Sequence, residues 1–184
     1  MIKCNTVGDE GKIIIINKGQ ANFNQIKFVM RARAPKHSKR PVFEKIFIIE
    51  GVAHATDGYR MHYANVDAMD NGIYDGLVDK NAQVVLSLCM GHDLSYPDRN
   101  SIICKNMEIE FGEEEVNFNK LIRLFYKALP YDSRMLDVDF IKDLFIDEKE
   151  NWRFSLAGEE QPAYFYNDTN ERFAIIQFMK ATQD

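Results

Sequence analysis

The chain has 184 residues, of which 46% are hydrophobic and 28% are charged, and these values are ordinary for a globular protein that buries a core. No apolar run approaches the roughly 18 residues of a membrane-spanning helix, and the first ten residues lack the apolar segment of a signal peptide. Three widely spaced cysteines, without a paired spacing, are typical of free thiols in a reducing compartment. The length suits one large domain or two small ones, and we expect a cytoplasmic protein without a cofactor.

The net charge of −5 at pH 7 hides an uneven distribution of basic residues. Residues 20–41 and 117–134 together hold 10 of the 23 basic residues but only one of the 28 acidic residues, Asp132. The remainder of the chain is strongly acidic. This pattern predicts a local contact with an anionic partner rather than general adhesion to polyanions.

The first part of the chain predicts a strand, a helix and then several strands. The run of four isoleucines in residues 12–17 favours a buried strand. Residues 21–34 have helical periodicity, with Phe23, Ile26, Val29 and Met30 on one face, and Pro35 is expected to end this helix. Further strands are predicted at residues 42–50, 52–56, 59–66, 73–78 and 84–90.

The second part repeats this order of elements, without residue-level identity to the first. An apolar stripe from Phe118 to Leu129 predicts a second amphipathic helix that ends near Pro130. Residues 138–145 fit a helix slightly better than a strand. Residues 101–104 and 107–111 are short apolar-rich runs, and the remaining predicted strands are residues 152–156, 163–166 and 173–179. Both predicted long helices carry basic residues opposite their apolar face. Such a face is either an ordinary solvated surface or a paired binding surface, and the sequence leaves both interpretations open.

Residues 53–63 predict a tight β-hairpin around Asp57-Gly58, because glycine supplies the positive φ that a two-residue turn requires. In that hairpin Thr56 would pair with Tyr59, and His54 with Met61. His54 and His62 would then point to opposite faces of the sheet and could not ligate one metal ion.

Other enzyme readings are equally weak. His37 and His92 lie in predicted loops, no cysteine has the surroundings of a nucleophile, and no glycine-rich phosphate loop is present. A small enzyme centred on His54 and Asp57 is the weakest alternative. We expect a binding protein, with neither a catalytic residue nor a metal site.

Two segments resemble the bacterial DNA polymerase sliding clamp, the β subunit of the replicative polymerase. Residues 55–61 resemble the Ala-Thr-Asp-Gly-His-Arg-Leu hairpin of that family, and Arg40-Pro41 resembles the stretch before it. Residues 174–180 are similar to its final strand, although Phe178 stands where the family has proline. The resemblance covers most of the chain in element order and about 20 residues in motif.

The resemblance implies an α+β DNA-clamp-like fold of two strand–helix–strands halves, with antiparallel sheets outside and two basic helices on one face. We expect one domain over residues 1–184, with halves at about 1–95 and 101–184. It also implies a processivity factor that binds double-stranded DNA without reading base sequence. The implied DNA-binding residues are Lys27, Arg31, Lys120, Arg123 and Lys127 on the helices, and Arg33, Lys36, Lys39, Arg40 and Arg134 in the loops that follow them.

The family also implies an apolar groove for peptide motifs of a polymerase or a clamp loader. Its candidates here are Ile176, Phe178 and Met179, which ordinary core packing explains equally well. A clamp subunit carries three such domains, so this chain would need six copies to close a comparable ring. The alternative is a clamp-fold adaptor or inhibitor, such as one encoded by a phage, that binds protein and does not encircle DNA.

Overall fold

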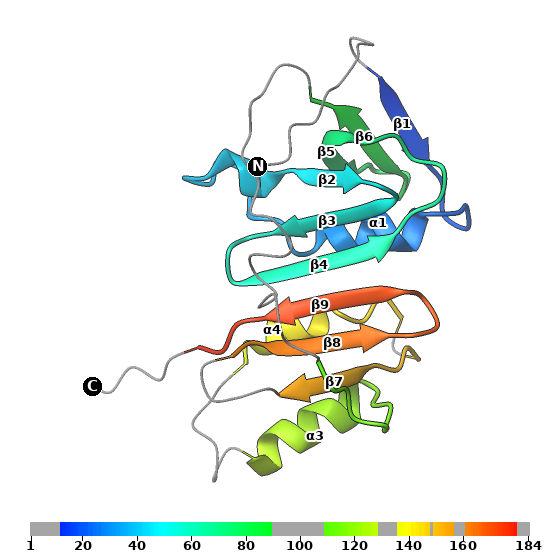
Figure 1. Cartoon of the computed structure of the whole chain (residues 1–184). Coiled ribbons are helices and arrows are strands. Elements are labelled where there is room, and N and C mark those ends of the chain that lie inside the picture. Colours follow the sequence, from blue (N-terminus) through cyan, green and yellow to red (C-terminus); the bar gives the residue numbers. More distant parts are fainter. Residues whose placement is uncertain (1–11, 90–108, 129–135, 148, 157–160, 180–184) are drawn as a thin grey trace.

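The structure is a computed structural model that describes residues 12–89, 109–128, 136–147, 149–156 and 161–179. Nine strands form one antiparallel sheet in the order β1-β6-β5-β2-β3-β4-β9-β8-β7 (Figure 1). The strands are β1 (Ile13–Ile16), β2 (Ile46–Ile49), β3 (Val52–Thr56), β4 (Arg60–Asn65), β5 (Gly72–Val78), β6 (Val84–Leu88), β7 (Arg153–Leu156), β8 (Ala163–Asn167) and β9 (Arg172–Ile176). The helices are α1 (Phe23–Met30), α3 (Phe118–Ala128), α4 (Val138–Lys142) and the 3₁₀ helix η1 (Pro41–Glu44).

Helices α1, α3 and α4 pack on one face of the sheet, as Figure 1 shows for α1 and α4 behind it. Successive residues of a strand point to opposite faces. On β4, Ala64 therefore joins the main core together with residues of α1, α3 and α4, whereas Met61 and Tyr63 belong to a second apolar cluster on the other face. The α+β clamp-like arrangement with both long helices on one face is confirmed.

The pairing of β4 with β9 joins the early and late parts of the chain into a single sheet. Met61 lies opposite Ile175 in this pair. On the helix side, the buried Trp152 contacts Phe28 of α1, with 5.5 Å between ring centroids, and also contacts Phe145 just after α4. One core therefore runs behind the whole sheet. The division into halves at about 95 and 101 stays a prediction.

The prediction of a buried first strand is wrong. β1 lies at an edge of the sheet, and the side chains of Ile13 and Ile15 are 61% and 55% exposed. Only the alternate residues of β1 face the helices, and Ile16 is buried among them. A run of β-branched residues specifies a strand but does not specify how many neighbours that strand has.

Two element boundaries also differ from the sequence prediction. Helix α1 ends at Met30, well before Pro35, because the chain tightens into turns in which Ala32 N–H bonds Val29 C=O at 3.1 Å. Residues 42–50 were predicted as one strand, but they begin in η1, where Pro41 fits the first helical turn. β2 covers only the end of that range.

The hairpin is confirmed, but its predicted register is wrong. Thr56 pairs with Met61 and His54 with Tyr63, so four residues form the loop. The Asp57 carboxylate accepts hydrogen bonds from the backbone N–H groups of Tyr59 and Arg60 at 2.9 and 3.0 Å. This side-chain-to-backbone turn replaces the two-residue turn that Asp-Gly predicted. Gly58 still supplies the positive φ, at 96°.

The remaining predictions divide between described and undescribed residues. Residues 138–145 contain helix α4, as their spacing indicated. Residues 101–104 lie outside the described residues, and the described part of 107–111 forms no strand. Within the described ranges, no helix has the length and apolar character needed to cross a membrane.

Candidate nucleic-acid interface

Helix α3 directs its apolar side into the core and a basic side away from it. Leu121 is fully buried, and Phe118, Ile122 and Phe125 pack against the core, at the three- and four-residue spacing of one helix face. Arg123 and Lys127 lie four residues apart on the exposed side. Arg123 and Lys127 therefore form a solvent-facing basic pair on the helix side of the sheet.

Lys120 lies near the start of the same helix, where its backbone N–H donates to the side chain of Asn117 at 3.0 Å. Its ammonium group forms a salt bridge with Glu114. Both side chains are substantially exposed, and an ion pair of this kind contributes little to stability. Lys120 is available to an anion that competes with Glu114.

The cations of α1 are placed differently. Lys27 is half-buried, with its ammonium group 5.9 Å from the ring centroid of Phe23. Arg31 donates to the backbone carbonyl groups of Asp143 and Phe145, at 3.3 and 2.8 Å, beyond the end of α4. The Arg31 guanidinium therefore joins two helices to each other inside the protein.

Arg33 is also used internally. It donates to the carbonyl groups of Met30, Glu44 and Gly76, the last at 2.7 Å. Burial lowers the pKa of its guanidinium, and the nearby charges of Asp75 and Glu44 partly offset that effect. The geometry gives Arg31 and Arg33 structural roles, so we remove both from the proposed set of DNA-binding residues.

The loop after α1 carries exposed cations. Lys36, Lys39 and Arg40 are all exposed, and the Arg40 guanidinium lies 5.5 Å from the ring centroid of Phe43. Arg134 lies outside the described residues. The sequence-predicted residues that the structure leaves at least partly accessible are therefore Arg123 and Lys127 on α3, Lys120 beside Glu114, the half-buried Lys27 on α1, and the three cations of the loop.

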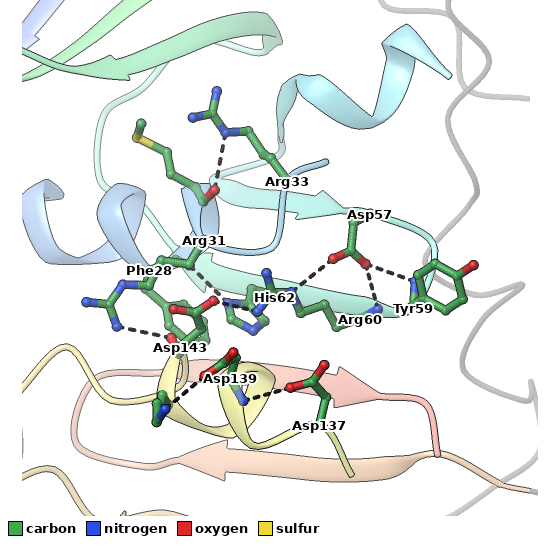
Figure 2. A network of polar contacts seen from close by, with 12 residues as sticks. Phe28, Arg31, Arg33, Asp57, Tyr59, Arg60, His62, Asp137, Asp139 and Asp143 are labelled. Atoms are coloured by element: carbon green, nitrogen blue, oxygen red, sulfur yellow. Dashed lines mark hydrogen bonds and ion pairs between the residues drawn. The ribbon is translucent and has the colours of Figure 1, made fainter. Parts of the chain in front are cut away.

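A polar network that the sequence reasoning missed links the hairpin to α4 (Figure 2). The Arg60 side chain bonds Asp57 at 3.1 Å and Asp143 at 2.6 Å, and its guanidinium lies 4.2 Å from the ring centroid of Phe140. The spacing of Asp57 and Arg60 in the hairpin motif could have indicated the contact between these two residues. The long-range half, to Asp143, has no signal in the sequence.

His62 lies beneath this network and is fully buried. Its Nδ1 donates to the backbone carbonyl of Phe28 at 2.9 Å, and its ring stacks on that residue at 4.3 Å. Burial is the main reason that the pKa of His62 is lowered from 6.5 to about 3, and nearby arginines add to the effect. His62 is therefore neutral at physiological pH and serves as a core residue.

The prediction that the two hairpin histidines face opposite sides of the sheet is confirmed. His54 shares the face of Tyr63, whereas His62 packs against α1. In the ranges that the structure describes, no three His, Cys, Asp or Glu side chains gather in a way that could hold a metal ion.

The three candidates for a peptide groove differ in how exposed their side chains are. Ile176 is fully buried in the main core, and Phe178 packs partly against it. Met179 is 43% exposed. We therefore remove Ile176 from the proposed groove, because its side chain lies in the protein interior, and only Phe178 and Met179 stay as candidates.

The fold defines a class: this chain has the fold of the bacterial sliding clamps. It is similar to DNA polymerase III subunit β from Borrelia burgdorferi, with a TM-score of 0.59 and 13% identity over 97% of this chain and 65% of that chain. It is also similar to the sliding clamp of Pseudomonas aeruginosa, with a TM-score of 0.55 and 12% identity over 97% of this chain and 70% of that chain. For the DNA polymerase III β chain of Streptococcus pneumoniae, the TM-score is 0.55 and the identity is 10%, over 98% of this chain and 67% of that chain.

Sequence comparison adds nothing to this structural likeness. No protein-family model matches the chain, and no curated protein matches it. At 10–13% identity the likeness is one of fold.

Proposed function

We propose that this chain is a sliding-clamp-like protein that binds the backbone of double-stranded DNA and tethers replication or repair proteins to it in the cytoplasm. The observation that carries the proposal is the exposed Arg123–Lys127 pair on a helix that covers the sheet of a clamp fold. Long cationic side chains on such a helix neutralise phosphates and read no base sequence. The work is electrostatic, and no bond is broken.

The proposed contact also includes Lys120, Lys27 and the exposed loop cations Lys36, Lys39 and Arg40. Each phosphate that is neutralised releases condensed counterions, so log K should fall with log salt concentration by about 0.9 per contact. The acidic remainder of the chain keeps other surfaces from binding DNA. Phe178 and Met179 are the proposed contacts for a short peptide of a polymerase or a clamp loader.

The test is the double substitution Arg123→Glu and Lys127→Glu, measured by fluorescence anisotropy with labelled duplex DNA at low salt. We expect a loss of affinity of at least tenfold and a salt slope reduced by about 2, from two contacts. The matched control is Lys18→Glu with Lys80→Glu, which makes the same charge change at two exposed lysines near the strand ends. Equal loss in both variants, or no binding by the unmodified protein, would contradict the proposal.

A clamp-fold adaptor or inhibitor that binds protein is the second candidate. The internal use of Arg31 and Arg33 favours it, because two of the predicted DNA contacts are then unavailable. If the chain is such an adaptor or inhibitor, the double substitution Arg123→Glu and Lys127→Glu should leave its activity unchanged, and the variant should still bind its protein partner.

A further inference from the structure

β1 is an edge strand whose outward backbone groups have no partner in the described part of the chain. Among the strands that the structure describes, β1 pairs only with β6. The Lys12 carbonyl accepts from the N–H of Leu88 at 3.0 Å, and in an antiparallel pair every second residue faces the same neighbour. Ile14 and Ile16 therefore bond β6, whereas Ile13 and Ile15 direct their N–H and C=O groups away from the sheet.

The side chains at this edge are apolar and exposed. Ile13 and Ile15 are 61% and 55% exposed, and they lie on the face opposite the helices. Val85 and Leu77 continue the same row across β6 and β5, and Leu77 is 47% exposed. Proteins usually protect edge strands with a charge, a proline or a bulge, and the run from Ile13 to Ile16 contains none of these.

The opposite edge of the sheet is covered. The backbone N–H of Gly112 donates to the carbonyl of Phe154 in β7 at 3.2 Å, and Val116 and Trp152 exchange two hydrogen bonds just before that strand. A head-to-tail contact of β1 with β7 of another copy would have to displace this segment. A contact of β1 with another β1 displaces nothing that the structure describes.

We propose that two copies of this chain associate through antiparallel pairing of their β1 strands, about a two-fold axis at Ile14. Ile13 then lies opposite Ile15 of the partner subunit, and each such pair exchanges two backbone hydrogen bonds. A two-fold contact requires a surface that is complementary to itself. The isoleucine run meets this condition, because its free backbone groups and exposed side chains belong to the same two residues.

The register follows from a neighbouring turn. An axis at Ile15 would place Ile13 opposite Asn17, but the N–H of Asn17 already donates to the Gln20 side chain at 2.6 Å. The Asn17 carbonyl already accepts from the backbone N–H of Gln20 at 3.1 Å. The axis at Ile14 pairs the outward backbone groups of Ile13 and Ile15 with described residues alone, and it keeps the helices of both copies on one side.

The first experiment measures solution mass by light scattering across a concentration series. We expect a concentration-dependent species of twice the 21.4 kDa chain mass, and Ile15→Lys should convert it to monomer because an edge lysine opposes pairing. The matched control is Leu77→Lys, which removes an exposed apolar side chain from the same face but from an interior strand. Circular dichroism confirms that both variants fold. A strict monomer, or equal dissociation of both variants, overturns the proposal.

The second experiment tests the register by oxidative cross-linking, with Cys4, Cys89 and Cys104 first replaced by serine. In the proposed pair, Ile14 lies opposite Ile14 of the partner subunit at a non-hydrogen-bonded position, where Cα atoms approach to about 4.5 Å, within disulfide range. Ile14→Cys should therefore cross-link and Ile16→Cys should not. Cross-linking of neither variant, or of both equally, contradicts the register. The β1 pairing uses no residue of the proposed DNA contact, so its failure leaves the proposed function standing. Its success makes the assembly an open pair of chains rather than a ring of six copies.

Discussion

The cations on the two long helices are used in opposite ways. Directly after α1, Arg31 directs its guanidinium to carbonyl groups inside the protein, while on α3 Arg123 and Lys127 face solvent. The sequence presents both helices as amphipathic with a basic polar face. The difference indicates that a basic face is available as a binding surface only where no neighbouring carbonyl or carboxylate group takes up its charges. We call Arg31, Arg33 and other cations bonded inside the protein the inward set, and the solvent-facing cations of α3 and of the loop after α1 the outward set. Stability should depend on the inward set, and DNA binding on the outward set.

The largest effect is expected at the most deeply buried cation, Arg172. Its side chain is 1% exposed and bonds Glu150 at 2.6 Å, above the ring of Phe28 at 5.4 Å. Glu150→Ala leaves this charge buried without its carboxylate, which should lower the free energy of unfolding by about 3–5 kcal/mol. Urea denaturation measures the loss. The comparison variant is Asp168→Ala, which breaks the exposed pair with Arg153 and should cost at most about 1 kcal/mol.

The next largest effect on stability is expected for Arg31→Met, which tests whether the internal hydrogen bonds of Arg31 stabilise the fold. The variant keeps the aliphatic bulk but loses the bonds to the carbonyl groups of Asp143 and Phe145. Because hydrogen bonds from a charged donor contribute about 1.5–3 kcal/mol, we expect unfolding free energy to fall by about 2–3 kcal/mol. DNA affinity of the folded protein should stay unchanged. A stable variant with weakened DNA binding would return Arg31 to the binding surface.

His62 predicts a pH dependence of stability. The folded pKa of about 3 lies below the reference value of 6.5, so below pH 6.5 the unfolded chain binds a proton that the native state excludes. The contribution of neutral His62 to the free energy of unfolding is therefore fully present above pH 6.5 and is lost as the pH falls towards 3. Between pH 7 and pH 5 the loss should be about 2 kcal/mol. His62→Phe, which retains the stacking surface, should flatten this part of the profile in denaturant titrations. The exposed His37 is the control, and His37→Gln should leave the slope intact.

The sequence predicted elements better than it predicted contacts. The apolar stripes of α1 and α3 and the opposite facing of the two histidines followed from periodicity, which is a local property. The hairpin register did not follow, because the Asp57 carboxylate bonds backbone N–H groups and lengthens the loop. Arg31 and Arg60 both bind residues near position 143, far along the chain. Residue spacing carries no information about such long-range contacts, and for that reason the internal hydrogen bonds of Arg31 were not predicted.

The smallest effect on stability is expected at the salt bridge between Lys120 and Glu114, where both groups are exposed. Glu114→Gln should change unfolding free energy by less than about 0.5 kcal/mol. It should nevertheless raise affinity for duplex DNA severalfold, because Lys120 no longer has a competing carboxylate when it meets a phosphate. Glu113→Gln makes the same charge change at an exposed neighbour. If Lys120 contacts DNA, Glu114→Gln exceeds Glu113→Gln in anisotropy titrations. If the two variants bind equally, the gain comes from net charge alone and the outward set is confined to Arg123, Lys127 and the loop.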